Sequence, residues 1–148
     1  MIAKVQLKES SIRSLEKNLN KVYSNVLEAG KAAVYISSQE ALEYSKDMCP
    51  KDTYTLVNTA YGDDPEVKGS EVRVHIGYAS PETDQMNPVT GLMASTYAVD
   101  VHENPSYYHP TGTYKFLEYA MLESAEFFKD RVSEALKEAL SASPFAGV

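Results

Sequence analysis

Two histidines and a glutamate near the end of the chain could bind a metal ion. His102 and Glu103 are adjacent, and His109 follows in a stretch rich in proline and tyrosine. Imidazole and carboxylate groups are common zinc ligands, and a catalytic zinc site uses three protein ligands. The spacing is not the i, i+4 spacing of two ligands on one helix. A small metal-dependent hydrolase using His102, Glu103 and His109 is therefore an alternative that the sequence leaves open.

The single cysteine could act as a nucleophile. Cys49 would need a base such as His75 in contact with it, and the sequence alone does not show such contact. Cys49 lies where a helix is expected to end, and a small buried apolar residue is the commoner role there. The chain has no glycine-rich phosphate loop and no Gly-x-Ser-x-Gly motif. We therefore assign no catalytic, metal-binding or cofactor-binding residues and expect a protein that is not an enzyme.

Chain length, net charge and hydropathy exclude further classes of protein. The chain has 148 residues, which suits a single domain over residues 1–148, and a formal net charge of −7. This acidic charge argues against a nucleic-acid-binding protein, because binding to phosphates needs a clustered positive face. The sequence has no apolar run of about 20 residues and no signal-peptide pattern. The single cysteine fits a reducing compartment, and we expect a protein that does not enter a membrane.

Two long helices are expected to position the candidate residues. The first carries a narrow apolar stripe with alternating spacings of three and four residues and ends near Cys49, because Pro50 follows. The last helix covers about residues 117–140. Residues 1–9 read as an extended leader and residues 143–148 as a flexible tail. The stripe consists of Ile12, Leu15, Leu19, Val22, Val26, Ala29, Ala33 and Ile36.

Three strands are expected between the helices. Residues 53–61, 72–78 and 97–102 are rich in β-branched and aromatic residues, and residues 72–78 alternate most clearly. Residues 80–91 and 103–113 contain proline, glycine and asparagine and read as long loops. The predicted fold is therefore α+β: a small antiparallel β-sheet packed against a long N-terminal helix and a long C-terminal helix, with two long loops.

The two loops carry apolar and aromatic side chains that suit a protein–protein interface. Tyrosine is favoured at interfaces because it combines a large apolar ring with a polar tip. Long loops in a small domain are often functional. The alternative is that both loops fold back over the sheet. The residues expected to contact other subunits or partners are Met86, Leu92, Met93, Tyr107 and Tyr108.

Three short motifs, taken in order, resemble the head–tail joining (tail-completion) proteins of tailed bacteriophages. Residues 50–56 match a Pro-x-Asp-Thr-Gly-x-Leu-like turn after the first helix, residues 97–103 match a Tyr-Ala-x-x-Val-His/Glu-Glu segment, and residues 115–120 match a Phe-Leu-x-x-Ala helix start. The residues that carry the resemblance are Pro50, Asp52, Thr53, Leu56, Tyr97, Ala98, Val101, Glu103, Phe116 and Leu117. Tyr54 stands where the family has glycine, so the turn must differ or hold a side chain at a strained position. The Glu-x-Gly-Thr sequence that often follows is not intact after Glu103, where Asn104 and Pro105 stand instead.

The resemblance implies a structural protein of the virion neck that is made in the host cytoplasm. Such proteins are ring-forming subunits of the neck (tail completion or terminator proteins, head–tail connectors) that join the tail to the DNA-filled head. The implied partners are further copies of the chain in a hexameric or dodecameric ring, the head-side connector and the tail-tube proteins. Genomic DNA would pass without sequence-specific binding, and an acidic wall would repel it. An alternative is a minor capsid or head-decorating protein of the same fold.

Overall fold

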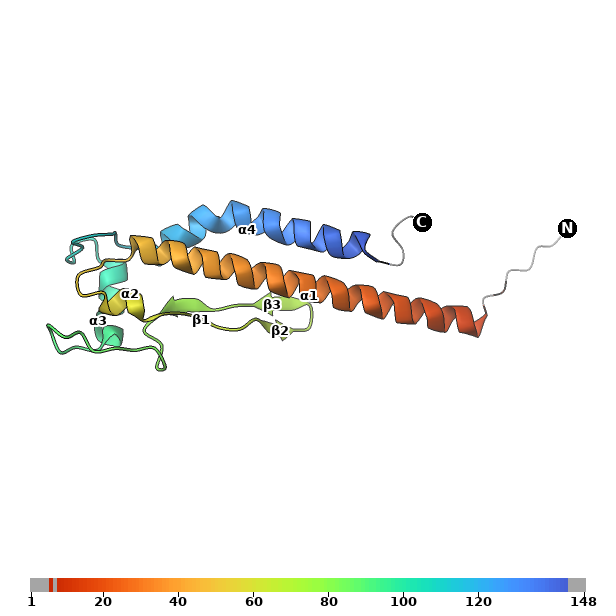
Figure 1. Ribbon diagram of the computed structural model, residues 1–148, viewed down its shortest axis with the longest axis horizontal. Coiled ribbons are helices and arrows are strands. Elements are labelled where there is room, and N and C mark those ends of the chain that lie inside the picture. The colour runs from red at the N-terminus through yellow and green to blue at the C-terminus, as the bar shows by residue number, and fades with distance from the viewer. Residues whose placement is uncertain (1–5, 7, 144–148) are drawn as a thin grey trace.

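Two long antiparallel helices form the frame of the protein. The computed structural model describes residue 6 and residues 8–143. Helix α1 (Glu9–Met48) runs unbroken for 40 residues, and α4 (Phe116–Ser141) returns alongside it (Figure 1). The extent of α1 confirms the long first helix that the sequence predicts. The helix ends two residues before Pro50, close to the predicted end near Cys49. Most of the expected leader and residues 144–148 of the expected tail lie outside the described residues.

Small side chains allow α1 and α4 to approach closely. The buried positions of α1 include Gly30, Ala33, Ser37 and Ala41. A Cβ atom built on Gly30 would lie 3.6 Å from the Leu136 side chain, so α4 packs directly over this glycine. The narrow apolar stripe predicted for the first helix therefore becomes a helix–helix contact over its C-terminal half.

A narrow β-region lies on the other side of α1 (Figure 1). Strand β1 (Ala60–Gly62) pairs with β4 (Ile76–Tyr78), and β2 (Glu66–Lys68) pairs with β3 (Glu71–Arg73). Both pairs are antiparallel, so the predicted α+β class with a small antiparallel β-region against long helices is confirmed. The β-strands contact α1, which therefore lies between α4 and the strands.

The expected strand at residues 72–78 is interrupted. Its first residues lie in β3, which pairs with β2, and its last residues lie in β4, which pairs with β1. Three residues separate β1 from β2, whereas only two residues separate β3 from β4. Pro65 lies within the longer connection and has no N–H to donate to a ladder. The unequal spacers shift the register by one residue, and Asp63 N–H donates to the His75 carbonyl across the break.

The expected first strand at residues 53–61 is wrong over most of its length. Its middle forms the one-turn helix α2 (Thr55–Asn58), and β1 follows. Thr55, Leu56 and Val57 are all buried. A strand places successive side chains on opposite faces, whereas a helical turn can bury three consecutive residues in one core. Burial in the folded protein therefore overrides a β-rich composition here.

The expected third strand at residues 97–102 is also wrong, because this segment lies inside helix α3 (Ala94–Glu103). Ala94 and Val101 are buried, Tyr97 and Ala98 are half-buried, and Val99 is exposed. This i, i+3, i+4, i+7 pattern is helical. It was present in the sequence but was masked by the β-branched residues at alternate positions.

The core is small and lies where α1 ends and α4 begins. Phe116 is 1% exposed, and its ring meets the Tyr78 ring edge-on at 5.1 Å. The buried members of this core are Cys49, Leu56, Val57, Ala94, Val101 and Phe116, and Leu117 packs against them. No helix in the described part of the chain has an apolar stretch long enough to cross a membrane.

Candidate functional site

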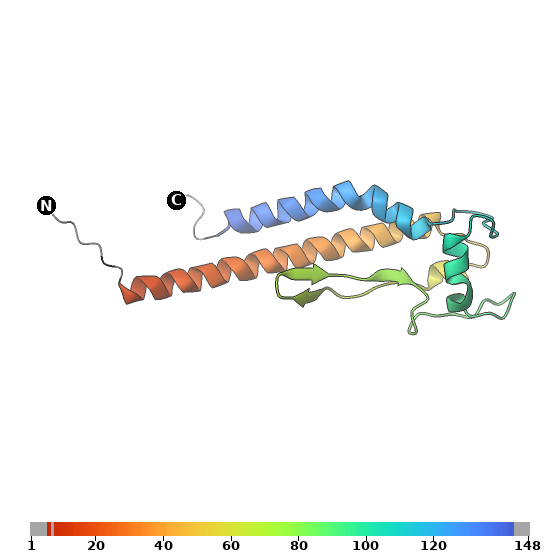
Figure 2. The same ribbon diagram turned by 180° about the vertical axis from the view of Figure 1, so that it is seen from behind.

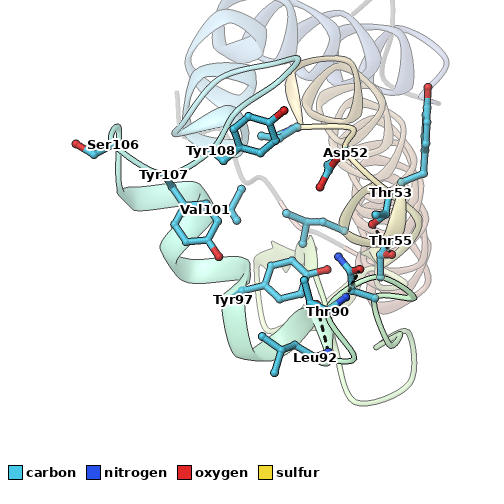
Figure 3. Close-up of a pocket in the computed structure, with 14 residues that line it drawn as sticks. Asp52, Thr53, Thr55, Thr90, Leu92, Tyr97, Val101, Ser106, Tyr107 and Tyr108 are labelled. Atoms are coloured by element: carbon cyan, nitrogen blue, oxygen red, sulfur yellow. Dashed lines mark hydrogen bonds between the residues drawn. The ribbon is translucent and has the colours of Figure 1, made fainter.

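A hollow of about 430 Å³ opens at the end of the molecule where α1 ends and the two long loops meet (Figure 3). We call it the loop-end pocket. Its walls come from the α1–α2 turn, from α3 and from both loops. The lining residues are Pro50, Asp52, Thr53, Tyr54, Thr55, Leu56, Asn87, Thr90, Leu92, Tyr97, Val101, Ser106, Tyr107 and Tyr108.

The turn between α1 and α2 forms one wall. Cys49 has an extended backbone, as expected for a residue that precedes proline, and this ends α1. The hydroxyl groups of Thr53 and Thr55 hydrogen-bond at 2.8 Å, and between them Tyr54 adopts a left-handed backbone with φ 60°. The chain therefore makes at Tyr54 the backbone conformation that glycine adopts most easily.

Tyr54 provides a direct test of backbone strain. Replacing Tyr54 with glycine should raise the free energy of unfolding by about 1 kcal/mol, because a side chain in the left-handed region is destabilising by about 1–2 kcal/mol and glycine removes most of that strain. Urea denaturation measures the change. The matched control is Tyr54→Ala, which removes the ring but keeps a Cβ, and it should show no gain. Equal gains for both variants would mean that the ring, not the backbone, is the source of strain.

Helix α3 forms the opposite wall. Tyr97 and Val101 are one turn apart and face the pocket, with Tyr97 directed toward its middle (Figure 3). The Tyr97 hydroxyl oxygen is buried and has no hydrogen-bond partner of acceptable geometry among the described residues. Burial raises the pKa of Tyr97, and the nearby Asn87 side chain partly opposes that rise. The pocket wall thus contains a phenol group that stays protonated near neutral pH.

The first long loop is folded back and held by its own asparagine. The Asn87 side-chain oxygen accepts hydrogen bonds from the backbone N–H groups of Val89 and Thr90, at 2.9 and 3.2 Å. Asn87 is buried, and sequence reasoning missed it, although asparagine before proline is a known turn signal. Among the predicted contact residues in this loop, Leu92 lines the pocket.

Two other predicted contact residues lie outside the pocket. Met86 and Met93 form an isolated antiparallel bridge that closes the first loop, and both side chains are exposed. Met86 is 63% exposed, which leaves it free to contact another molecule. The prediction that these methionines serve as contacts remains a prediction.

The second loop contributes the paired tyrosines. Tyr107 and Tyr108 both line the pocket and both remain exposed. The loop is tied to the α1–α2 turn, because the Lys51 N–H donates to the Thr111 hydroxyl oxygen at 3.1 Å. Each loop is therefore held against the body while it presents apolar side chains outward, and the role of those side chains in contacts with other subunits stays a prediction.

The three possible metal ligands, His102, Glu103 and His109, form hydrogen bonds within the protein. His102 Nδ1 lies 2.7 Å from a Glu103 carboxylate oxygen, while His109 Nε2 donates to the Val101 carbonyl at 2.8 Å. The His102 ring packs edge-on against Phe116, at 4.9 Å between ring centres. The hydrogen bond from His102, with help from Lys115, lowers the pKa of Glu103. Within residue 6 and residues 8–143, no cluster of three or more possible ligands is placed to hold a metal.

Cys49 and His75 are not arranged as a nucleophile and base. Cys49 is fully buried in the core, whereas the His75 side chain is 69% exposed and lies 3.6 Å from the Asp63 carboxylate. Burial raises the pKa of the Cys49 thiol from 9.0 to about 12. The thiol therefore stays protonated near neutral pH, which suits a packing role.

The buried thiol predicts a loss of stability in alkali. Between pH 9 and 12 the unfolded chain ionises Cys49 while the folded chain keeps the proton, so rising pH favours unfolding. The contribution is at most about 1.4 kcal/mol per pH unit. Urea denaturation at several pH values should give a shallower decline for Cys49→Ala than for the parent protein. Parallel declines would contradict the assignment.

The motif residues from distant parts of the sequence meet at this end of the molecule. Six of them line the pocket: Pro50, Asp52, Thr53, Leu56, Tyr97 and Val101. Phe116 lies in the adjacent core, Leu117 and Ala98 pack against that core, and Glu103 ends α3. The fold and site therefore define an α+β protein with a pocket of neutral polar, aliphatic and tyrosine side chains and one carboxylate, Asp52. Comparisons with protein-family models, curated proteins and solved structures find no match.

Proposed function

We propose that this protein is a structural component of the tailed-phage neck, where it self-associates into a ring that joins the tail to the DNA-filled head. The resemblance of the three motifs to head–tail joining proteins carries this proposal. The left-handed backbone of Tyr54 supports it, because it occurs at the motif position where the family has glycine. Tyr54 was the main departure from the motif, and its conformation meets the same backbone requirement.

The surface of the chain supports an assembly role. Large apolar side chains are exposed on the two long helices, α1 and α4, and on the two long loops, while the buried core is small. Contiguous exposed apolar surface is typical of protein–protein contacts. We assign the loop end, with Leu92 and Tyr108 at the pocket and Met86 beside it, to contacts with ring neighbours, the head-side connector or the tail-tube proteins.

The structure also guides the choice of variant. Deleting residues 82–90 should leave a folded monomer that cannot join heads to tails if that loop is a contact. The loop is anchored, however: the Thr83 hydroxyl donates to the Thr59 carbonyl, and Asp84 accepts from Ser95 at the start of α3. Single substitutions of exposed side chains therefore separate contact from folding better than the deletion does.

The decisive experiment uses phage particles that carry variant subunits. Leu92→Glu should give DNA-filled heads and free tails by electron microscopy, with a plaque titre at least tenfold lower. Val99→Glu is the matched control, because Val99 is 70% exposed on α3 and does not line the pocket. Normal titres for Leu92→Glu would contradict the contact assignment. Density for the protein on the head shell instead of the neck would favour the minor capsid alternative.

A further inference from the structure

The first part of α1 projects beyond the rest of the molecule. Figures 1 and 2 show α1 continuing past the C-terminal end of α4 and past the turn between β2 and β3. Ala142, just after α4, shares a shallow groove with Ala29 of α1, so α4 stops near that level. We call residues 9–25 the projecting segment; its last turn still reaches the turn between β2 and β3, where the Tyr23 hydroxyl donates to the Gly69 carbonyl at 3.3 Å. Residues 9–21 are exposed apart from Asn18, which is intermediate.

An uncovered apolar stripe runs along this segment. Ile12, Leu15 and Leu19 are 44%, 48% and 53% exposed. Their spacing of three and four residues continues through Val22 and Val26 into the part of α1 that α4 covers. The contact face between α1 and α4 therefore extends beyond the end of α4 without a partner in the described chain. Such a seam is the type that a second helix covers in a coiled coil.

We propose that a second copy of this chain covers the stripe, with the two projecting segments antiparallel about a two-fold axis near residue 17. In this register Ile12 packs against Val22 of the second copy, and Leu15 packs against Leu19. The symmetry repeats both contacts, so four apolar layers form from one stripe. A two-fold contact of this kind uses the same surface on both copies.

The length of the uncovered stretch favours this occupant. The two-fold register places residue 9 of the second copy opposite residue 25, close to the level at which α4 ends. A 17-residue helix spans about 25 Å, and the second copy presents a helix of that length because its own α1 begins at Glu9. Each α1 then takes the place that a longer α4 would have occupied on the other copy.

The charge pattern of the segment is consistent with self-pairing. At 100° per residue, Ser11 and Asn18 flank the stripe on one side, while Lys17 and Lys21 lie on the opposite face of the helix. This flank therefore carries no charge that would select an acidic or basic foreign helix. Glu16 flanks the stripe on its other side and approaches its own mate near the axis, which weakens the pair.

The contact is expected to be weak. Three half-exposed apolar side chains per copy, together with the less exposed Val22, bury less surface than the 1,200–2,000 Å² of a stable interface. We therefore expect reversible dimers with dissociation constants of about 10–100 µM. A two-fold pair differs from the head-to-tail contact that builds a ring, so this inference does not rest on the proposed neck function.

Sedimentation velocity over a range of concentrations tests the surface. The parent protein should shift from monomer to dimer, and Leu19→Glu should weaken the association at least tenfold because it disrupts two layers. Asn20→Glu is the matched control: it adds the same side chain one position away and off the stripe, and it should change the association less than twofold. Circular dichroism checks that both variants keep their helices. A monomeric parent at several hundred µM, or equal effects of both variants, would overturn the proposal.

Cross-linking tests the register. Mixing Ile12→Cys protein with Val22→Cys protein and adding a short bis-maleimide should give a cross-linked dimer of the two different variants. Each variant alone should cross-link at least tenfold less, and the parent should not cross-link because Cys49 is buried. Dimers of Ile12→Cys alone would indicate parallel pairing and overturn the register. Rings of the parent without the mixed cross-link would support the neck function but overturn this pair.

Discussion

Replacing Gly112 with alanine should lower the free energy of unfolding by about 3 kcal/mol or more, combining left-handed backbone strain of about 1–2 kcal/mol with a steric clash. Gly112 has φ +89°, and an added Cβ would lie 2.3 Å from the Met48 carbonyl oxygen and 2.9 Å from Pro50 N. These are backbone atoms at the end of α1, so no side-chain rotation can relieve the contact. Any shift of the loop would also strain the Thr113 N–H bond to the Met48 carbonyl.

A substitution at Gly91 measures the backbone strain without the steric clash. Gly91 also has a positive φ, +71°, but an added Cβ there would meet no atom within 4 Å. Gly91→Ala should therefore cost about 1 kcal/mol from backbone strain alone. Urea denaturation of both variants measures the difference of about 2 kcal/mol. Equal losses for the two variants would mean that the second loop does not pack on the end of α1 as described.

Truncating Phe116 should have an effect of similar size. Phe116 is 1% exposed, and its ring contacts both Tyr78 and His102 edge-on. Buried Phe→Ala changes cost about 3–5 kcal/mol, because apolar contact is lost and a cavity remains. We expect about 4 kcal/mol here, since the ring joins the start of α4 to β4 and α3.

Phe127 is the matched control on the same helix. It is 74% exposed, so Phe127→Ala should change the free energy of unfolding by about 0.5 kcal/mol or less. Thermal and urea unfolding measure both variants, and near-ultraviolet circular dichroism reports the loss of ordered tyrosine packing in Phe116→Ala. A small loss for Phe116→Ala would contradict a core centred on this residue. If Phe116→Ala does not fold, Phe116→Leu should retain the fold with a loss of about 1–2 kcal/mol.

The placement of this core explains why the two proposed contact surfaces lie at the two ends of the molecule. Side chains from α1, α2, α3 and α4 bury one another at one end, where the loop-end pocket lies beside them. At the opposite end the first turns of α1 have no described neighbour on their apolar face. The length of α1 therefore separates the two proposed contact regions.

The sequence by itself determined the features that depend on neighbours along the chain. The apolar spacing from Ile12 to Ile36 predicted one long helix because a 3.6-residue repeat aligns those side chains whatever they pack against. Pro50 marked its end, since the residue before proline avoids helical backbone. The irregular stretches around residues 80–91 and 103–113 were predicted correctly because proline, glycine and asparagine favour turns through local geometry.

Only the tertiary structure decided the features that depend on burial against distant segments. Residues 55–58 and 94–103 have strand-like composition but form helices, because those turns bury their apolar side chains around Phe116 and Cys49. The loop-end pocket combines residues from Pro50 to Tyr108, so no local pattern could have predicted that Thr55 and Asn87 line the same hollow. The left-handed backbone of Tyr54 and the lack of space for a side chain at Gly112 have the same origin. Each is set by a backbone path that the whole fold imposes.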